Sequence, residues 1–390
     1  MVTLDVPRAQ VLAYRVAAHQ FDRAVRAPGD LAVLDLGVQD TPYGSARVAL
    51  SARTDARTDE APDARTDGAS GARAGVAPGA PTDGEPGDLT LLWAARGAPT
   101  LHRTADLPRL AAALWPLSDA DATTRIASTV IRDGAKLGIA AFRAAAEAMH
   151  DVVRGALPKG EVSTAVSARI PASLTFWCAT CDAQHISGAL FQQVGLFAGV
   201  RLDLTDGTAL APVPGWPGVP SEARGTADVL DTYLRLLGPA TQMEAAKFLG
   251  TTAARIKDAW PGDLTEVRID GRSAWLPGDA VDALRDAPKP RVVRLLPPLD
   301  PYLQARDRDL LVPDRARQSA VWKAIGSPGV VLVDGEVAGT WRGKLAGRKR
   351  LDVEVVPFAP WPARVTREVG TEAARVAEVR GVPEVRVTGH

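Results

Sequence analysis

Residues 226–287 carry the pattern that most constrains how this chain can fold. The first helix ends at Gly238-Pro239, because proline cannot continue a helix interior. Thr241 and Glu244 then have the spacing of a capping box. Two segments in which apolar and polar residues alternate flank Asp270-Gly271, a dipeptide that favours a tight hairpin. The unit is predicted to be a winged helix whose hairpin follows three helices: Ala227–Leu237, Thr241–Leu249 and Thr251–Trp260.

The rest of the chain divides around this unit into an α+β protein. Helical patterns followed by a hairpin-like segment recur near the N-terminus, which predicts tandem winged-helix domains. Strand-like segments with turn signals at Asp334-Gly335 and Gly343–Arg348 predict a C-terminal antiparallel β-barrel. We expect four parts: a winged helix at 1–117, a second helical or winged-helix domain at 118–220, the winged helix at 221–290, and the barrel with a last helix at 291–390.

Residues 54–87 differ in composition from everything around them. ARTD units repeat at the start, and Gly, Ala, Pro and Asp follow without large apolar residues. Such a stretch buries too little surface to offset its ordering entropy, so we predict a disordered insertion within the first domain. A flexible loop that tracks DNA is the functional alternative.

Composition limits the class of protein. Lys+Arg and Asp+Glu are both 46, so the chain is no bulk polycation, although local basic patches are compatible with a neutral total. No stretch approaches the roughly 20 apolar residues of a membrane span. Two cysteines in 390 residues are typical of a reducing compartment. We expect a soluble cytoplasmic protein.

Gln39 and Asp40 form the first candidate site. They follow the apolar segment Leu31–Val38 and precede a predicted helix, Tyr43–Arg53. An amide and a carboxylate at a helix start can position and activate a water molecule. Alternatively, Asp40 only caps the helix together with Thr41 and Pro42, since proline is favoured at the first helical position. The two interpretations are compatible.

This segment resembles the tandem winged-helix DNA glycosylases that unhook interstrand crosslinks, the AlkZ/YcaQ-like family. The resemblance is carried by three stretches: LGVQDTPYGSARVALSAR (Leu36–Arg53), RLLPPLDPYLQARDRDLLVPDRAR (Arg294–Arg317) and VVLVDGEVAGTWRGKLAGRKRLDVEVVPF (Val330–Phe358). The family carries a Gln-x-Gln or Gln-x-Asp catalytic pair in the first stretch. Gln39 falls on its first glutamine, and Thr41 then stands at the partner position. Asp40 lies one residue early; if Gln39 is instead the second member, Gly37 takes the first place.

The resemblance implies a monofunctional DNA glycosylase that hydrolyses the N-glycosidic bond of N7-alkylated or crosslinked purines. Asp40 would accept a proton from the attacking water, and Gln39 would hold that water in line. The sugar would pass through an oxocarbenium-like state, as in glycoside hydrolysis. No lysine lies beside the motif to form a Schiff base, so water is the expected nucleophile. No cofactor is implied.

A second constellation lies at Cys178, Cys181 and His185. Thiolates and imidazole are the usual ligands of zinc, and this spacing suits them. A structural site takes four ligands, however, and no cysteine remains to supply the fourth. Two buried cysteines that act as small apolar residues are the alternative. Trp177, beside this group, is predicted to lie in a core, as are Trp93, Trp115 and Trp275.

Basic residues in two places are candidates for phosphate contacts. The alternative for each is an ordinary solvated face, and acidic neighbours such as Asp258 and Glu266 favour that alternative in the winged helix. Phosphate contacts would make binding fall with salt. The candidates are Arg255 and Lys257 on the third predicted helix, Arg268 and Arg272 on the wing, and Arg342, Lys344, Arg348, Lys349 and Arg350 in the densest basic cluster.

A rival from another class is a non-catalytic winged-helix DNA-binding protein or transcriptional regulator. Thr41 in place of a second Gln or Asp favours this rival. A regulator is expected to dimerise on a palindrome, whereas tandem winged helices in one chain favour a monomer. We therefore expect a monomeric, nucleoid-associated enzyme whose partner is double-stranded DNA with alkylated or crosslinked purines.

Overall fold

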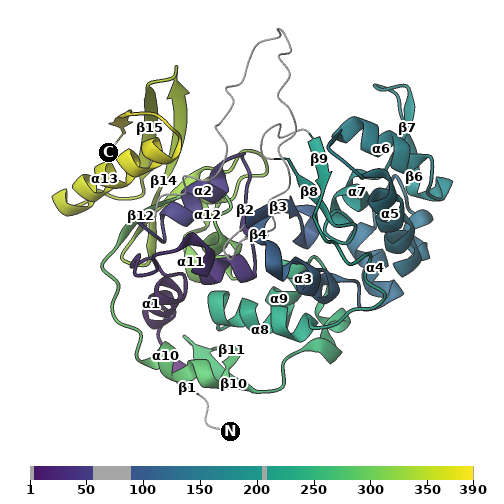
Figure 1. Ribbon diagram of the computed structural model, residues 1–390. Helices are drawn as coiled ribbons and strands as arrows, with labels where there is room; N and C mark the ends of the chain where they lie inside the picture. The colour runs from purple at the N-terminus through teal and green to yellow at the C-terminus, as the bar shows by residue number, and fades with distance from the viewer. Residues whose placement is uncertain (1–3, 56–88, 204–208, 390) are drawn as a thin grey trace.

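The computed structural model describes residues 4–55, 89–203 and 209–389. Within these ranges the strands form five small sheets with helices packed around them (Figure 1). The predicted disordered insertion lies outside the described residues except for Thr54 and Asp55. The Thr54 hydroxyl donates to the Val25 carbonyl at 2.7 Å, and Asp55 pairs with Arg375 at 2.9 Å, so the chain is anchored up to this point. None of the described helices is long and apolar enough to cross a membrane.

The N-terminal part joins short helices to a three-stranded sheet of order β2-β4-β3. The predicted hairpin after residue 88 is present as β3 and β4, which pair antiparallel. The helix predicted over Tyr43–Arg53 is confirmed over Ser45–Ser51, so it is two residues shorter than predicted at each end. The elements are α1 (Arg8–Ala18), β2 (Val38–Gln39), α2 (Ser45–Ser51), β3 (Leu89–Trp93), β4 (Pro99–Arg103) and α3 (Leu107–Leu114).

The second part is mainly helical. Ser118 caps its first helix, and its hydroxyl accepts from the Asp121 N–H at 3.2 Å. One small sheet has the order β5-β9-β8, and β6 and β7 form a separate hairpin. The elements are α4 (Asp119–Ile126), α5 (Ile139–Val152), β5 (Leu157–Pro158), α6 (Lys159–Ser167), β6 (Thr175–Cys178), β7 (Ala183–Ile186), α7 (Gly188–Gln193), β8 (Val200–Leu202) and β9 (Ala209–Pro212).

The third part follows the predicted order except in its third helix. The capping box of Thr241 and Glu244 is present, and the hairpin turns at Asp270-Gly271. The segment 251–260 forms two 3₁₀ turns rather than an α-helix. Gly250 ends the preceding helix in a left-handed conformation, and Pro261 disfavours the α-helical conformation of the residue before it. The elements are α8 (Thr226–Leu237), α9 (Gln242–Leu249), β10 (Leu264–Ile269), β11 (Arg272–Pro277) and α10 (Val281–Arg285), with β1 (Leu4–Val6) added parallel to β10.

The C-terminal part is a curled five-stranded sheet of order β12-β13-β14-β15-β16. Its two edge strands do not pair with each other, so it is a half-barrel rather than the predicted closed barrel. Its last pair is parallel because α13 crosses between β15 and β16. The elements are β12 (Val293–Leu296), α11 (Arg308–Leu311), α12 (Arg315–Val321), β13 (Gly329–Val333), β14 (Glu336–Ala346), β15 (Arg350–Pro357), α13 (Ala363–Val379) and β16 (Glu384–Thr388).

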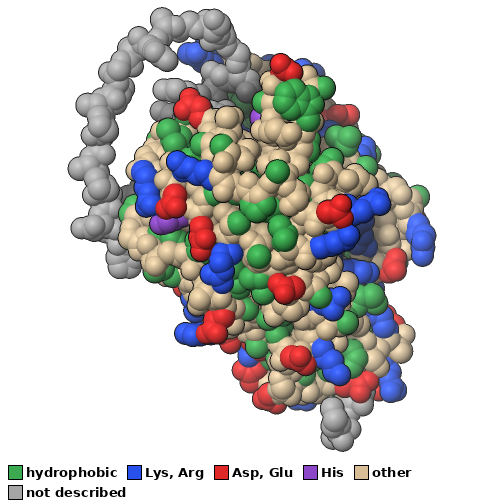
Figure 2. Space-filling view, turned by 90° about the vertical axis from the view of Figure 1, so that its right-hand side faces the viewer, with side chains coloured by type: hydrophobic (Ala, Val, Ile, Leu, Met, Phe, Trp, Pro, Cys, Tyr) green, Lys and Arg blue, Asp and Glu red, His purple; other side chains and the backbone are tan. Residues whose placement is uncertain are grey.

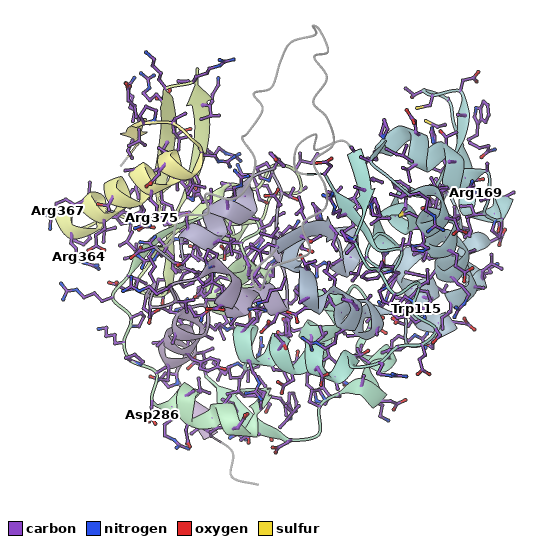
Figure 3. The ribbon with its side chains drawn as sticks, in the orientation of Figure 1. Trp115, Arg169, Asp286, Arg364, Arg367 and Arg375 are labelled. Carbon is purple, nitrogen blue, oxygen red and sulfur yellow. The ribbon has the colours of Figure 1, made fainter. Side chains whose placement is uncertain are left out.

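Apolar packing and buried ion pairs hold these parts together. Trp115 is fully buried and meets Phe197 edge-on at 5.0 Å between ring centroids (Figure 3). Trp93 is also buried, as predicted, whereas Trp177 is 56% exposed at the end of the β6–β7 hairpin. A second apolar cluster packs α13 against the C-terminal sheet. A buried Arg53–Asp300 pair ties α2 to the segment after β12.

Candidate functional site

Gln39 and Asp40 lie where the sheet β2-β4-β3 meets the start of α2. Gln39 ends β2 and pairs with Thr100 of β4. The Asp40 N–H donates to the Pro99 carbonyl at 2.9 Å, which fixes the backbone one residue beyond the strand. Thr41 is exposed, whereas Asp40 is 8% exposed. The loop therefore holds the carboxylate of Asp40 inward, one residue after Gln39 in the chain.

The Asp40 carboxylate caps the start of α2, although Asp40 lies five residues before the first residue of this helix. Its Oδ1 accepts from the Ala46 N–H at 2.9 Å, and the Gly44 N–H also donates to this carboxylate. The predicted capping role is thus confirmed, but its predicted geometry is wrong. Pro42 is not the first helical residue, because Gly44 adopts a left-handed conformation and the helix begins at Ser45.

Burial and charge act on Asp40 in opposite directions. Burial raises the pKa of the Asp40 carboxyl, and this is the largest effect. The two backbone N–H groups and the positive charges of Arg380 and Arg47 oppose it. Arg380 follows α13, and its Nη1 donates to the Tyr43 carbonyl at 3.1 Å. Asp40 therefore holds its proton more tightly than an ordinary aspartate does.

The amide of Gln39 belongs to a chain of polar contacts. Its Oε1 accepts from Gln304 Nε2 at 3.4 Å, and the same nitrogen donates to the Leu299 carbonyl at 3.1 Å. Arg96 Nη2 donates to Gln304 Oε1 at 3.1 Å. The Arg96 guanidinium also lies over the Phe248 ring, 4.9 Å from the ring centroid. These contacts fix the acceptor end of the Gln39 amide, so its NH₂ end points the other way.

Three residues of this site carry no local signal in the sequence. Gln304 lies in a stretch that resembles the family, but nothing there links it to Gln39. Arg96 adopts a left-handed conformation in the turn between β3 and β4, and Arg380 lies 340 positions after Asp40. Only the packing of distant segments brings these side chains to the pair.

Gly37, two residues before Gln39, packs closely against His102. Replacing Gly37 tests this packing. Gly37 has φ +88°, and a Cβ there would lie 2.3 Å from His102 Cε1. His102 is buried and held by the Thr100 hydroxyl at 2.9 Å and the Leu34 carbonyl at 3.2 Å. We expect Gly37→Ala to lower the free energy of unfolding by about 2–3 kcal/mol, from overpacking added to left-handed strain. Urea unfolding measures the change.

Gly271→Ala is the matched control for this prediction. Gly271 has φ +87°, but no neighbouring atom lies within 4 Å of the position a Cβ would take. The control carries the backbone strain alone, about 1 kcal/mol. Equal losses in the two variants would contradict the packing of His102 against Gly37.

The structure separates the two groups of basic candidates. Arg342, Lys344, Arg348, Lys349 and Arg350 lie on β14, β15 and their turn, whereas Arg268 and Arg272 lie on β10 and β11. Figure 1 shows these two hairpins at opposite ends of the molecule, with α2 nearer to β14 and β15. Arg255 and Lys257 are exposed on the 3₁₀ turns after α9.

Ion pairs occupy several of these basic side chains. Arg272 pairs with Glu244 at 2.8 Å, and Arg268 lies 3.9 Å from Asp5. Arg350 pairs with Asp352 at 2.8 Å. Lys344, Arg348 and Lys349 are exposed at the end of the β14–β15 hairpin. The face in Figure 2 intersperses basic and acidic side chains, so that face as drawn carries no continuous basic patch.

The second constellation, Cys178, Cys181 and His185, is brought together as its spacing predicts. Ligand atoms of Cys178, Cys181 and His185 all lie within 4.8 Å of one another at the β6–β7 hairpin. Cys178 is half-buried and Cys181 is exposed. The alternative of two buried cysteines acting as apolar residues is therefore wrong, because the hairpin end lies at the surface.

Comparisons of structure and of sequence relate this chain to known proteins. The structure of the Streptomyces sahachiroi DNA glycosylase AlkZ superposes with a TM-score of 0.69, over 99% of this chain and 100% of that one, at 20% sequence identity. The chain thus shares the fold of that structure. Residues 80–379 match the family model described as DNA glycosylase AlkZ-like. This chain belongs to the AlkZ-like DNA glycosylase family.

A curated relative matches a shorter region. It is the interstrand DNA cross-link repair glycosylase of Streptomyces sahachiroi, 32% identical over 186 residues. The alignment covers 44% of this chain and 47% of that protein, so the chain matches about half the length of this relative. The family match begins after Gln39 and Asp40. The case for this pair therefore rests on its geometry and on the motif that it resembles.

Proposed function

We propose that this chain is a monofunctional DNA glycosylase that hydrolyses the N-glycosidic bond of N7-alkylated or crosslinked purines. The observation that carries the proposal is the buried Asp40 carboxylate beside Gln39, in a chain of the AlkZ-like family. A relative is named for interstrand cross-link repair, and this supports a bulky crosslinked lesion as one substrate.

The proposed reaction uses water as the nucleophile. Asp40 accepts a proton from the water as the water oxygen bonds to C1′ of the sugar. The bond from C1′ to the purine breaks at the same time, and its electron pair leaves with the purine. Gln39, held by Gln304, donates a hydrogen bond from its NH₂ group to that water and keeps the water in line. N7 alkylation places positive charge on the purine, so the base leaves without a strong general acid. The negative charge of Asp40 also stabilises the oxocarbenium-like sugar.

The raised pKa of Asp40 predicts a pH dependence. A general base works in its deprotonated form, and burial raises the pKa of this carboxyl above its ordinary value. Base release is therefore expected to fall as the pH drops, with the midpoint above the range of an exposed aspartate. Arg380→Gln removes a positive charge that lowers this pKa, so it should move the midpoint to higher pH. A midpoint that does not move in this variant would contradict Asp40 as the titrating group.

We propose that DNA is double-stranded and binds along the side of the molecule that carries β14, β15 and α2. The helix and hairpin units at 1–117, 118–220 and 221–290 are interpreted as tandem winged helices. Exposed Lys344, Arg348 and Lys349 support phosphate contacts there, since the loop of Asp40 lies on the same side (Figure 1). A contact from the wing of β10 and β11 stays a prediction. The protein is proposed to act as a monomer on the nucleoid.

Removing charge from this hairpin should weaken DNA binding in a salt-dependent way. The double variant Arg348→Ala/Lys349→Ala removes two exposed positive charges. We expect lower affinity for any duplex, and a plot of log affinity against log salt that is shallower by about 0.9 per lost contact. Fluorescence anisotropy over a salt series measures both. Arg285→Ala, on α10 at the other end of the molecule, is the control, and an equal effect there would contradict this surface.

Base release by the wild-type chain tests the proposed function. The substrates are a duplex with N7-methylguanine and a duplex with a nitrogen-mustard crosslink, assayed in single turnover in the presence of a metal chelator. Release of the alkylated base, without strand cleavage, is the expected result. Binding without release from either duplex would establish the rival, a DNA-binding protein with a glycosylase fold.

A further inference from the structure

The end of the β6–β7 hairpin carries a group of side chains that glycosylase chemistry does not use. Cys178 ends β6, Cys181 lies in the turn, and His185 lies on β7 across from Phe176. One ligand atom from each lies within 4.8 Å of the other two. In Figure 1 this hairpin lies at the far side of the molecule from α13.

The distances approach those of a zinc centre. Zn–S bonds of about 2.3 Å and Zn–N bonds of about 2.0 Å in a tetrahedron separate ligand atoms by roughly 3.5–3.8 Å. A contraction of about 1.3 Å at most brings the three atoms to that spacing. The Cys181 sulfur lies in the exposed turn and the half-buried Cys178 sulfur at the end of β6, so small rotations of these two side chains close the distances.

The histidine is prepared for a metal by its neighbours. His185 Nδ1 lies 3.4 Å from the Ser163 hydroxyl on α6. Its Nε2 is buried and has no hydrogen-bond partner among the described residues. A ring that donates from Nδ1 presents the Nε2 lone pair, and a ligating histidine normally donates from its other nitrogen in this way. A buried nitrogen without a partner is costly, and a metal bond would satisfy it.

The turn also places backbone donors beside the first sulfur. Backbone N–H groups of Thr180 and Cys181 donate to Cys178 Sγ. Such donors spread the negative charge of a metal-bound sulfur and orient it toward the second cysteine. The sulfur pair and the imidazole thus form a preorganised three-ligand set on one hairpin.

We propose that Cys178, Cys181 and His185 bind one divalent zinc ion whose fourth position is open to water. Both thiols lose their protons on binding, and the ion neutralises the two thiolates. The ion fixes the hairpin end, where Trp177 is 56% exposed. The site lies apart from Gln39 and Asp40.

Cobalt(II) substitution in the full chain tests the site, because cobalt reports ligand type and geometry through its spectrum. We expect about one equivalent of cobalt to bind, with the sulfur charge-transfer band and intense visible bands of a four-coordinate thiolate complex, and zinc to displace it. The chain has two cysteines, so any such band must arise from Cys178 and Cys181. Cys178→Ser and Cys181→Ser should abolish the band.

The histidine variants complete the test. His185→Ala should weaken zinc binding by about 10–100-fold in a competition with a chromophoric chelator, and Ser163→Ala should weaken it less. His150→Ala, which alters a histidine held by the Ala198 carbonyl, is the control and should bind zinc as the wild type does. Weak bands of an octahedral ion, or equal zinc affinity in wild type and Cys178→Ser, would overturn the proposal.

Discussion

Asp40→Asn is expected to slow release of an N7-alkylated base by about 10²–10⁴-fold, the contribution of a positioned general base. The variant keeps an oxygen that accepts from the Ala46 N–H, so the loop before α2 retains its shape. The amide cannot take the proton of the attacking water, and it does not stabilise positive charge on the sugar. Single-turnover base release measures the loss.

The stability of Asp40→Asn separates this loss from unfolding. Burial raises the pKa of Asp40 in the folded chain, so the folded state binds this proton more tightly than the unfolded state does. Stability is therefore lost as the pH rises through that pKa and the buried carboxylate ionises. Asparagine avoids this cost, and we expect an equal or higher unfolding midpoint at neutral pH. Asp30→Asn, the same change at an exposed position, should leave both rate and stability unchanged.

Asp300→Ala is expected to lower the free energy of unfolding by about 3–5 kcal/mol, because it strands a buried charge. Both partners are fully buried, with Arg53 Nη2 2.6 Å from Asp300 Oδ1 and Nη1 2.9 Å from Oδ2. Asp300 also accepts from the Tyr302 N–H at 2.9 Å. The loss is a large share of the roughly 5–15 kcal/mol that a folded domain has.

Two further variants identify the mechanism of this loss. Arg53→Met/Asp300→Ala removes both charges, so it should be more stable than Asp300→Ala alone. Asp282→Ala breaks an exposed pair with Arg285, and its effect should stay within about 1 kcal/mol. The midpoints of urea unfolding compare the stabilities of these variants with that of Asp300→Ala. A single variant as stable as the double variant would contradict the stranded-charge account.

Local rules were enough to predict much of the fold. The capping box at Thr241 and the hairpin at Asp270-Gly271 depend on residues a few positions apart, and both are present. The helix predicted over Thr251–Trp260, after α9, is absent, and 3₁₀ turns take its place. The predicted closed barrel became a half-barrel because closure depends on how distant edge strands meet, which local patterning does not encode.

The candidate site divides in the same way. Gln39 and Asp40 were predicted from a carboxylate and an amide before a helix, and this required only a few neighbouring residues. The support from Gln304 and Arg380 comes from segments more than 260 positions away. The exposure of Cys178 and Cys181 was also missed, because an apolar strand pattern does not show which end of a hairpin reaches solvent.

The central claim is that Asp40, one residue before the family's partner position, is the general base that accepts a proton from the water that Gln39 positions. Single-turnover release of N7-methylguanine, measured side by side for Gln39→Ala, Asp40→Asn and Thr41→Val, tests it most directly. Thr41 is exposed, and valine removes its hydroxyl at similar size. We predict that release collapses in the first two variants, with DNA binding retained, and stays at the wild-type rate in Thr41→Val. Collapse in Thr41→Val, together with an active Asp40→Asn, would contradict the account.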